Sequence, residues 1–285
     1  MAQTSALQRR IRSVKNAKQI TKALEVVAAS RMRKVVQLVE GSRTYGELAA
    51  AVMAKVSANP EAQTHPFFSP SPGKPTLYIV ITSDRGQAGA FNSNIFHLTT
   101  GIIKEEKTRP QLIIFGRKGT AYFSRLSGID LRGVYEDIAD VPSVNIFSSV
   151  MDIAIDELTA GAISKVVIIY TQFISSLSQK AAAIDLFPVV LDQTADKSAR
   201  VYEFEPDISN VLDEGIRLYV EARLMQAKIE SSAAEQAMRM LAMGNASRNA
   251  TDLIDNLTLE LNATRQAVIT QEIAEITGGA AAIAT

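Results

Sequence analysis

The chain has 285 residues, 47% of them hydrophobic and 21% charged, with 30 basic and 30 acidic side chains, a composition typical of one large or two small globular domains. It contains no cysteine and only two histidines, which excludes disulfides, thiolate nucleophiles and CxxC zinc sites and leaves little for a histidine-based metal site. No stretch of about 18 uncharged apolar residues occurs, and no apolar block follows the basic start, so we expect neither a membrane-spanning segment nor a secretory signal.

The first 59 residues are predicted to form one long helix. They contain no proline, and strong helix formers dominate them. Five prolines from Pro60 to Pro75 then end the helical pattern. Residues 1–43 carry ten Lys or Arg against two Glu. A basic arm for nucleic acid is the alternative interpretation of this charge. The arm has no aromatic residue before Tyr45 and no nucleic-acid motif follows it, so we expect no nucleic-acid partner.

The middle of the chain, residues 75–205, is predicted to be a doubly wound, Rossmann-like α/β domain. Short β-branched apolar runs are typical of buried parallel strands. Helical stretches alternate with these runs, and the alternation implies right-handed βαβ crossovers. The strand candidates are 76–83, 111–116 and 165–173, with weaker ones at 131–138 and 178–190, and the helical stretches lie near 92–107, 117–127 and 143–160.

The third region, residues 207–285, is predicted to be a second long helix. From Ile216 to Thr277 it has no proline and a single glycine, Gly244. Residues 203–285 carry six basic side chains against thirteen acidic ones, opposite in sign to the first helix. An antiparallel coiled coil of the two terminal helices buries their apolar stripes and brings the opposite charges together. The expected seam consists of Leu7, Ile11, Val14, Ala28, Met32, Val35 and Val39 on the first helix, and Val220, Leu224, Ala227, Ala234, Met238 and Leu241 on the second.

Polar residues interrupt this seam on the first helix. Lys18, Thr21 and Glu25 occupy its middle, while nearby Ile20, Leu24 and Val27 shift the apolar face sideways. Two interpretations stay open. The pair is a loose coiled coil with solvated polar positions, or these polar residues face another protein rather than the second helix.

The last helical stretch, RQAVITQEIAEITGGAAA (265–282), is apolar over more than half its circumference. A chain end is normally frayed and polar. Because the two terminal helices differ in length, this stretch extends past its intrachain partner. We therefore expect another protein to surround it.

No reaction centre is predicted. The turn SDRGQAGAFNSN (83–94) joins a strand to a helix, where α/β proteins bind phosphates, but it lacks both G-x-G-x-x-G and the phosphate-loop pattern. We interpret it as a tight turn, and a nucleotide-binding enzyme that uses it is the alternative. Arg117 and Lys118 could hold an anion but are typical of solvated residues at a helix start. His65 and His97 belong to no triad or metal motif, so we expect no catalytic residue, cofactor or metal.

Three stretches carry a family resemblance: ITKALEVVAASRMRK (20–34), ITSDRGQAGAFNSN (81–94) and RQAVITQEIAEITGGAAA (265–282). Together with residues 233–254 they resemble, over essentially the whole chain, the γ subunit of bacterial rotary F-type ATP synthase. The resemblance implies a central rotor shaft whose tip lies inside a ring of three α and three β subunits. It also implies that the α/β domain lies at the foot of the shaft, on the membrane ring of c subunits and beside the ε subunit.

The same resemblance implies one copy per complex and no catalytic site in this chain. The shaft would couple ion-driven rotation to ATP synthesis or hydrolysis at the β subunits, as a peripheral protein on the cytoplasmic face of the bacterial cell membrane. By similarity, the residues that contact the β subunit are Lys22, Leu24, Arg265, Gln266, Thr270 and Glu272. Those implied at the c ring are Ser42, Arg43, Thr44, Tyr45, Tyr202 and Glu205. Ordinary surface charge and ordinary loops are the alternatives for these two groups.

Two positions depart from the family pattern. Gln87-Ala88 stands where the family often has Leu-Cys, and Gly244 stands where it often has lysine. The remaining rival function is a coiled-coil scaffold unrelated to ATP. That interpretation accounts for the long helices but not for the three matching stretches.

Overall fold

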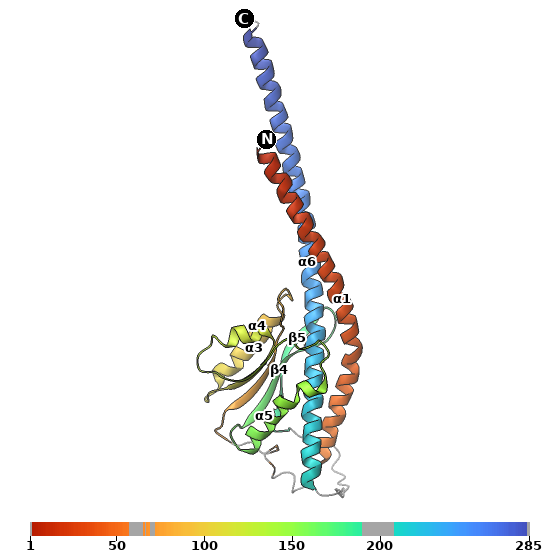
Figure 1. Cartoon of the computed structure of the whole chain (residues 1–285), viewed down its shortest axis with the longest axis vertical. Helices are drawn as coiled ribbons and strands as arrows, with labels where there is room; N and C mark the ends of the chain where they lie inside the picture. Colours follow the sequence, from red (N-terminus) through yellow and green to blue (C-terminus); the bar gives the residue numbers. More distant parts are fainter. Residues whose placement is uncertain (1, 57–64, 66, 69–71, 190–207, 284–285) are drawn as a thin grey trace. The chain divides into compact units, whose positions relative to one another are not determined.

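The computed structural model describes residues 2–56, 65, 67–68, 72–189 and 208–283 (Figure 1). An alternation of strands and helices lies in the chain between two long helices, so the predicted α/β fold with long terminal helices is confirmed. The elements are α1 (Ala2–Val56), β1 (Thr76–Ile81), α3 (Phe91–Glu105), β2 (Gln111–Phe115), α4 (Arg117–Phe123), β3 (Asp130–Tyr135), the short 3-10 helix η1 (Val144–Ile146), α5 (Ser148–Thr159), β4 (Lys165–Phe173), β5 (Gln179–Phe187) and α6 (Ile208–Ile283).

The chain forms two compact units. Unit 1 comprises Met1–Ala28 and Met240–Thr285, and unit 2 comprises Ala29–Arg239. Both α1 and α6 contribute residues to both units. The predicted regions 1–59, 75–205 and 207–285 follow the type of element along the sequence, and this division stays a prediction.

Unit 2 contains one five-stranded sheet in the order β3-β2-β1-β4-β5. The first four strands pair in parallel, which follows from the helices that connect them. Strand β5 pairs antiparallel with β4, because a short turn at residues 174–178 joins the two directly. The chain moves outward from β1 to β2 and β3, and then returns to the other side of β1. The sheet therefore has a topological switch point between β1 and β4.

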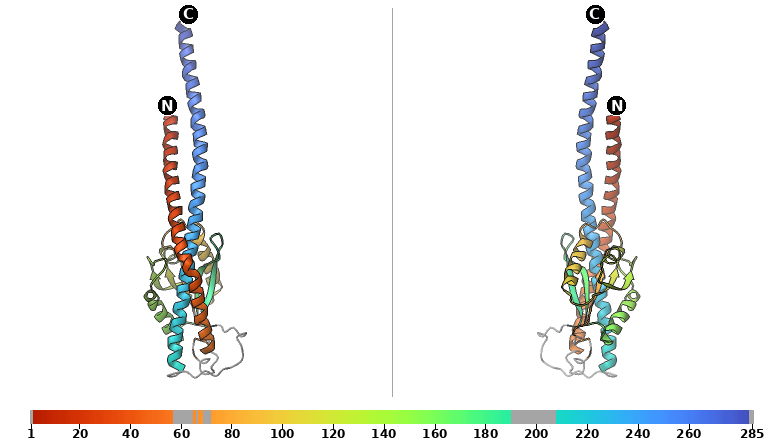
Figure 2. Two further views of the ribbon diagram at one scale, coloured as in Figure 1. Left: turned by 90° about the vertical axis from the view of Figure 1, so that its right-hand side faces the viewer. Right: turned by 90° about the vertical axis from the view of Figure 1, so that its left-hand side faces the viewer.

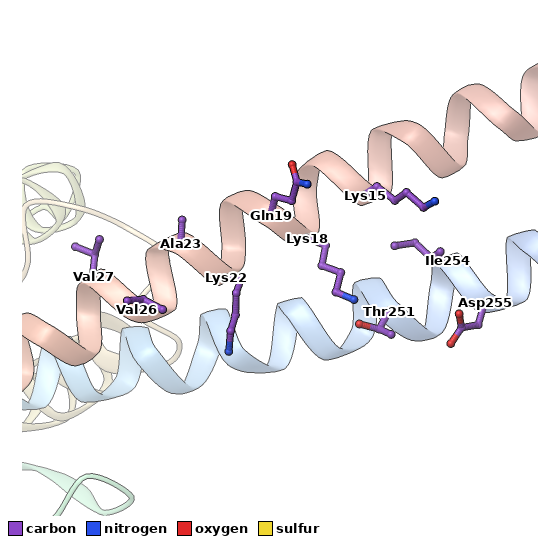
Figure 3. Close-up of a pocket in the computed structure, with 10 residues that line it drawn as sticks. All are labelled: Lys15, Lys18, Gln19, Lys22, Ala23, Val26, Val27, Thr251, Ile254 and Asp255. Atoms are coloured by element: carbon purple, nitrogen blue, oxygen red, sulfur yellow. The ribbon is translucent and has the colours of Figure 1, made fainter.

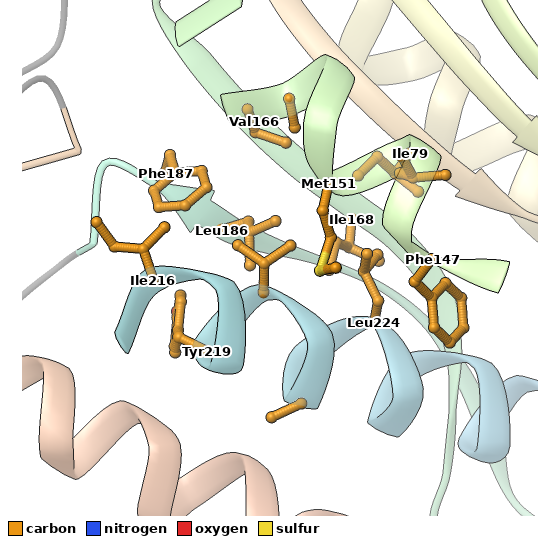
Figure 4. Packing of buried hydrophobic residues seen from close by; sticks show 14 of the residues in the cluster. Ile79, Phe147, Met151, Val166, Ile168, Leu186, Phe187, Ile216, Tyr219 and Leu224 are labelled. Carbon is orange, nitrogen blue, oxygen red and sulfur yellow. The ribbon is translucent and has the colours of Figure 1, made fainter. Parts of the chain in front are cut away.

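Helices cover both faces of this sheet (Figure 1). On one face, β1 and β2 pack against Ile95 of α3 and Phe123 of α4, both fully buried. On the other face, α5 and α6 form the larger cluster. Figure 4 shows Ile216, Tyr219 and Leu224 of α6 directed at the strands and at α5. Central strands that are covered on both faces explain the continuous apolar runs of the sequence.

Within unit 2, α1 and α6 run antiparallel and in contact. Gly46 of α1 lies where an added Cβ would meet the Gln226 side chain at 2.5 Å, and Gly215 of α6 lies against Met53. The seam residues predicted for this part of α1 and α6 are buried or half-buried. They are Met32, Val35 and Val39 on α1, and Val220, Leu224, Ala227, Ala234 and Met238 on α6.

In unit 1 the two helices also pair, and α6 continues past the start of α1 (Figure 2). Leu7, Ala28 and Leu257 are buried, whereas the exposed fraction of Ile20 is 61% and that of Val27 is 50%. Of the three residues predicted to shift the apolar face, Leu24 is half-buried, whereas Ile20 and Val27 are exposed. Lys18, Thr21 and Glu25 stay half-buried in the seam. The geometry favours the interpretation of a loose coiled coil whose polar side chains lie at the helix interface.

Gly244 in α6 provides a direct test of helix regularity in unit 1. A Cβ added there would lie 3.5 Å from the Glu25 carboxyl carbon, an ordinary van der Waals distance. Because alanine also loses less backbone entropy than glycine, Gly244→Ala should raise the free energy of unfolding by about 1 kcal/mol. Urea denaturation followed by helical circular dichroism measures this change. Gly41→Ala in α1 is the matched control, since nothing lies within 4 Å of that position. If only Gly41→Ala raises the free energy of unfolding, the methyl group added at Gly244 clashes with the Glu25 side chain.

Candidate partner-binding surfaces

A groove of about 800 Å³ runs between the two helices of unit 1 (Figure 3). Its α1 wall combines three lysines with apolar side chains, and the figure shows Lys18 and Lys22 directed toward α6. The exposed apolar part includes Val26 and Val27, with exposed fractions of 57% and 50%. The lining residues are Lys15, Lys18, Gln19, Lys22, Ala23, Val26, Val27, Thr251, Ile254 and Asp255.

The lysine of this groove that forms an ion pair forms only a weak one. Lys22 Nζ lies 3.1 Å from a carboxylate oxygen of Glu25, one turn away on the same helix. The Lys22 side chain is 61% exposed, so this pair contributes little to stability. Leu24, the other α1 residue expected at the β subunit, is half-buried. The groove thus presents a basic and apolar surface that suits an acidic, partly apolar partner segment.

The C-terminal part of α6 is exposed through residue 278, as predicted from its length. Ile269, Ile273 and Ile276 have exposed fractions of 50%, 57% and 72%. These three isoleucines lie at i, i+4 and i+7, so they form one stripe along the helix. An exposed apolar stripe of this kind marks a surface for another protein.

The polar residues expected at the β subunit lie in the same exposed stretch. Arg265, Gln266, Thr270 and Glu272 are all exposed. The Thr270 hydroxyl donates to the Gln266 carbonyl at 2.9 Å, within the helix. The remaining polar groups of these side chains are available to a partner, and their role stays a prediction.

The group expected at the c ring divides into two kinds. Ser42 and Thr44 donate hydrogen bonds to carbonyls of their own helix, Val39 at 2.8 Å and Glu40 at 3.1 Å. Tyr45 is 42% exposed, and burial of its ring raises the pKa of its hydroxyl, with a smaller contribution from the Glu221 carboxylate. Tyr202 and Glu205 lie outside the described residues.

Arg43 has a second role inside unit 2 that the sequence did not indicate. Its Nε and Nη2 each donate to the Glu230 carboxylate at 2.9 Å, and its Nη2 also donates to the Phe173 carbonyl. Glu230 is fully buried and accepts further hydrogen bonds from Gln226 and from the Phe173 backbone. These bonds connect α1, α6 and β4. The hydrogen bond to Glu230 raises the pKa of Arg43.

The turn at 83–94 is closed by its own side chains. The Asn92 carboxamide accepts from the Ser83 backbone N–H at 3.1 Å, and the Ser83 hydroxyl donates to the Arg85 carbonyl at 2.7 Å. Gln87 adopts a left-handed conformation with φ of 63°. Arg117 contacts the carboxylates of Asp84 and Asp137. The Ser83 backbone N–H is thus already engaged by the turn's own Asn92, which fits the interpretation of a tight turn.

Residues 227–237 of α6 are buried on every side of the helix, including Lys228, Glu230 and Glu235. Sequence reasoning missed these charged residues as a buried group. The run of small residues at 231–234 was the available signal, since Ser and Ala on every face of a helix allow close packing all round. Burial lowers the pKa of Lys228 and raises that of Glu235.

No helix in the described part of the chain is long and apolar enough to cross a membrane. Among the same residues, no group of three or more histidine or acidic side chains is arranged to hold a metal ion. The surfaces described above are grooves and helix faces of the kind that other proteins occupy. Fold and surfaces together define an interaction protein built from a helix pair and a Rossmann-like domain.

Comparisons with known proteins agree with this class. The ATP synthase family model matches residues 3–283. The ATP synthase gamma chain of Pelotomaculum thermopropionicum is 37% identical over 278 residues, which cover 97% of this chain and 98% of the relative. The ATP synthase gamma chain of Legionella pneumophila strain Paris is 37% identical over 289 residues, which cover 99% of this chain and all of the relative.

Two solved structures share the fold. The central stalk and c-ring structure of the Tetrahymena thermophila mitochondrial ATP synthase contains a chain 27% identical to this one, with a TM-score of 0.61, covering 80% of this chain and 99% of the other. The rotor of the Euglena gracilis mitochondrial enzyme contains one with a TM-score of 0.66 at 16% identity, covering 94% and 99%. The chain belongs to the ATP synthase γ family. It is accordingly a γ chain of ATP synthase, the central-stalk subunit, as the sequence predicted.

Proposed function

We propose that this chain is the rotating shaft that transmits ion-driven rotation to the nucleotide sites of three β subunits, and that it carries no catalytic residue itself. The exposed isoleucine stripe of α6 is the observation that carries the proposal. A stripe with no intrachain cover needs a surrounding protein. A ring of three α and three β subunits around residues 265–283 would supply that cover.

The proposal assigns the basic groove of unit 1 to an acidic segment of the β subunit. The exposed Lys15 and Lys22 supply the positive charge, and Val26 and Val27 supply apolar contact. One shaft inside three identical subunits presents a different face to each. Differential contacts of this kind are what shift each β subunit between binding states.

At the other end of the helices, we assign Thr44 and Tyr45 to the ring of c subunits, together with Tyr202 and Glu205. The Arg43 guanidinium binds Glu230, and the Arg43 side chain is 35% exposed. Arg43 can therefore contact the c ring only through this exposed part. The ε subunit is assigned to unit 2. The proposal includes one copy of the chain in each complex, peripheral to the cytoplasmic face of the membrane.

Native mass spectrometry of the complex purified from its own cells tests this assignment. The expected mass contains one copy of this chain with three copies each of two larger subunits. A homo-oligomer or a one-to-one complex would contradict the shaft and favour a coiled-coil scaffold. Nucleotide turnover by the purified chain alone would instead favour the enzyme alternative.

The isoleucine stripe can be tested by substitution. Changing Ile269, Ile273 and Ile276 together to aspartate should lower ATP-driven ion pumping by the assembled complex at least about twofold, because three charges would face an apolar sleeve. The free energy of unfolding of the chain itself should change by less than about 0.5 kcal/mol per substitution, since all three side chains are exposed. Gln271→Asp adds one charge on a polar position of the same stretch and serves as the control. A scaffold bound elsewhere would be indifferent to both changes.

A further inference from the structure

A polar cavity of about 190 Å³ in unit 2 has no assigned role. It lies at the carboxyl ends of β1 and β3, where open α/β sheets bind ligands. The walls come from α1, from the loops that follow these two strands, and from the buried part of α6. The lining residues are Arg31, Thr82, Asp84, Arg85, Asp137, Ile138, Ala139, Asp140, Lys228, Glu235, Gln236 and Arg239.

The carboxylates around this cavity are already paired. Asp84 and Asp137 both contact Arg117, and Asp84 also accepts the Arg117 backbone N–H at 3.1 Å. Asp140 accepts a hydrogen bond from the Gln236 amide at 3.3 Å. Glu235 accepts from Arg239 at 2.6 Å. Arg117 and Arg239 thus offset part of the negative charge around the cavity, while Asp140 has only a neutral partner.

Three cationic side chains around the cavity, in contrast, have no carboxylate partner among the described residues. Among the residues that the structure describes, Arg31, Arg85 and Lys228 make no ion pair within 4.0 Å. Lys228 is only 6% exposed, and its ammonium donates one hydrogen bond, to the Ser232 hydroxyl at 3.0 Å. An ammonium group has three donors, so two remain for the cavity.

A buried ammonium with one neutral partner is costly in water-excluded surroundings. Burial accordingly lowers the pKa of Lys228, although the carboxylates of Glu235, Asp140 and Asp84 act in the opposite direction. A negatively charged ligand beside Lys228 would supply the missing partner. Arg31 of α1 and Arg85 of the loop after β1 also line the cavity and carry the planar donor groups that suit oxyanions.

We propose that this cavity is a binding site for a phosphate-sized oxyanion, held by the buried Lys228 and by the exposed Arg85 and Arg31. The volume equals about six water molecules at roughly 30 Å³ each, which fits one such anion with part of its hydration shell. The site uses side chains rather than the backbone of the closed 83–94 turn. It goes beyond the shaft function and does not depend on it.

Isothermal titration calorimetry of the purified full-length chain with inorganic phosphate tests the site, with sodium chloride adjusted to hold the ionic strength constant. We expect saturable binding at one site per chain, with sulfate competing. Lys228→Met should weaken the affinity at least about tenfold, because a hydrogen bond between charged groups is lost. Arg85→Gln should weaken it by a smaller factor. Lys107→Met, an exposed lysine between α3 and β2, should leave it unchanged.

The source of the oxyanion is resolved by a second titration with ADP. Tighter binding of ADP in competition with phosphate identifies a nucleotide phosphate, and failure of ADP to compete identifies a free oxyanion. Absence of saturable phosphate binding overturns the proposal. So does equal affinity of the Lys228→Met and unchanged chains, or an equal loss for Lys107→Met. If Lys228→Met does not fold, Arg85→Gln and Arg31→Gln carry the same test, because both side chains are exposed.

Discussion

Replacing Arg43 with methionine should lower the free energy of unfolding by about 3 kcal/mol, because it leaves the Glu230 carboxylate buried without its cation. Glu230 is fully buried, and Arg43 supplies two of its four hydrogen bonds. Gln226 and the Phe173 backbone would remain as partners, which places the loss at the low end for a broken buried pair. Urea denaturation of the purified chain measures the change.

The matched control for this prediction is Arg217→Met. Arg217 on α6 pairs with Asp152 of α5 at 3.0 Å, but both side chains are about half exposed, so its loss should cost less than about 1 kcal/mol. Adding Glu230→Gln to Arg43→Met should recover part of the stability, because the unpaired charge is removed. An Arg43→Met loss no larger than that of Arg217→Met would mean that water reaches Glu230.

This prediction also bears on how Arg43 variants should be interpreted. A loss of coupling in such a variant would arise first from the loosened contact among α1, α6 and β4. Contact with the c ring is better tested at Tyr45, which is 42% exposed. Tyr45→Ala should change coupling with little change in stability if that contact exists.

Gly116→Ala should destabilise unit 2 by about 3 kcal/mol or more. Gly116 has φ of 98°, a conformation that residues with a side chain rarely adopt. An added Cβ would also lie 2.5 Å from the Thr82 carbonyl oxygen and 2.8 Å from the Thr82 hydroxyl. Neither atom can move freely, since the Thr82 hydroxyl donates to Phe115 and accepts from Gly119. The conformational strain and the overpacking therefore add.

Gly128→Ala separates these two contributions. Gly128 also has a positive φ, of 86°, but nothing lies within 4 Å of the added Cβ. Only the conformational cost of about 1 kcal/mol is expected there. Thermal unfolding of both variants measures the difference. Equal losses at the two positions would show that the Thr82 turn relaxes around the methyl group.

Much of the fold was predictable because hydrophobic periodicity reports burial directly. Strands β1, β2 and β4 are covered on both faces, and their sequences are continuous apolar runs. The edge strands β3 and β5 are partly exposed, and their sequences were correspondingly weaker strand candidates. The direction of β5 and the strand order depend on contacts between distant residues, which a local pattern does not contain.

The candidate surfaces were predictable to different degrees. The exposed stripe at Ile269, Ile273 and Ile276 followed from the unequal lengths of the two helices. The Glu230 pair did not, because its partners come from α1 and β4, 187 and 57 residues away along the chain. The polar cavity could not be predicted from the sequence for the same reason. Only folding brings Arg31, Arg85 and Lys228 around one space.

The polar seam of unit 1 has a mechanical consequence for a rotating shaft. Lys18, Thr21 and Glu25 occupy positions where apolar side chains would interlock, so the two helices of this unit resist twisting weakly compared with the densely packed helices of unit 2. Under torque, the deformation concentrates in the softer element. In the proposed shaft, unit 1 is therefore the part in which we expect twisting under torque to concentrate.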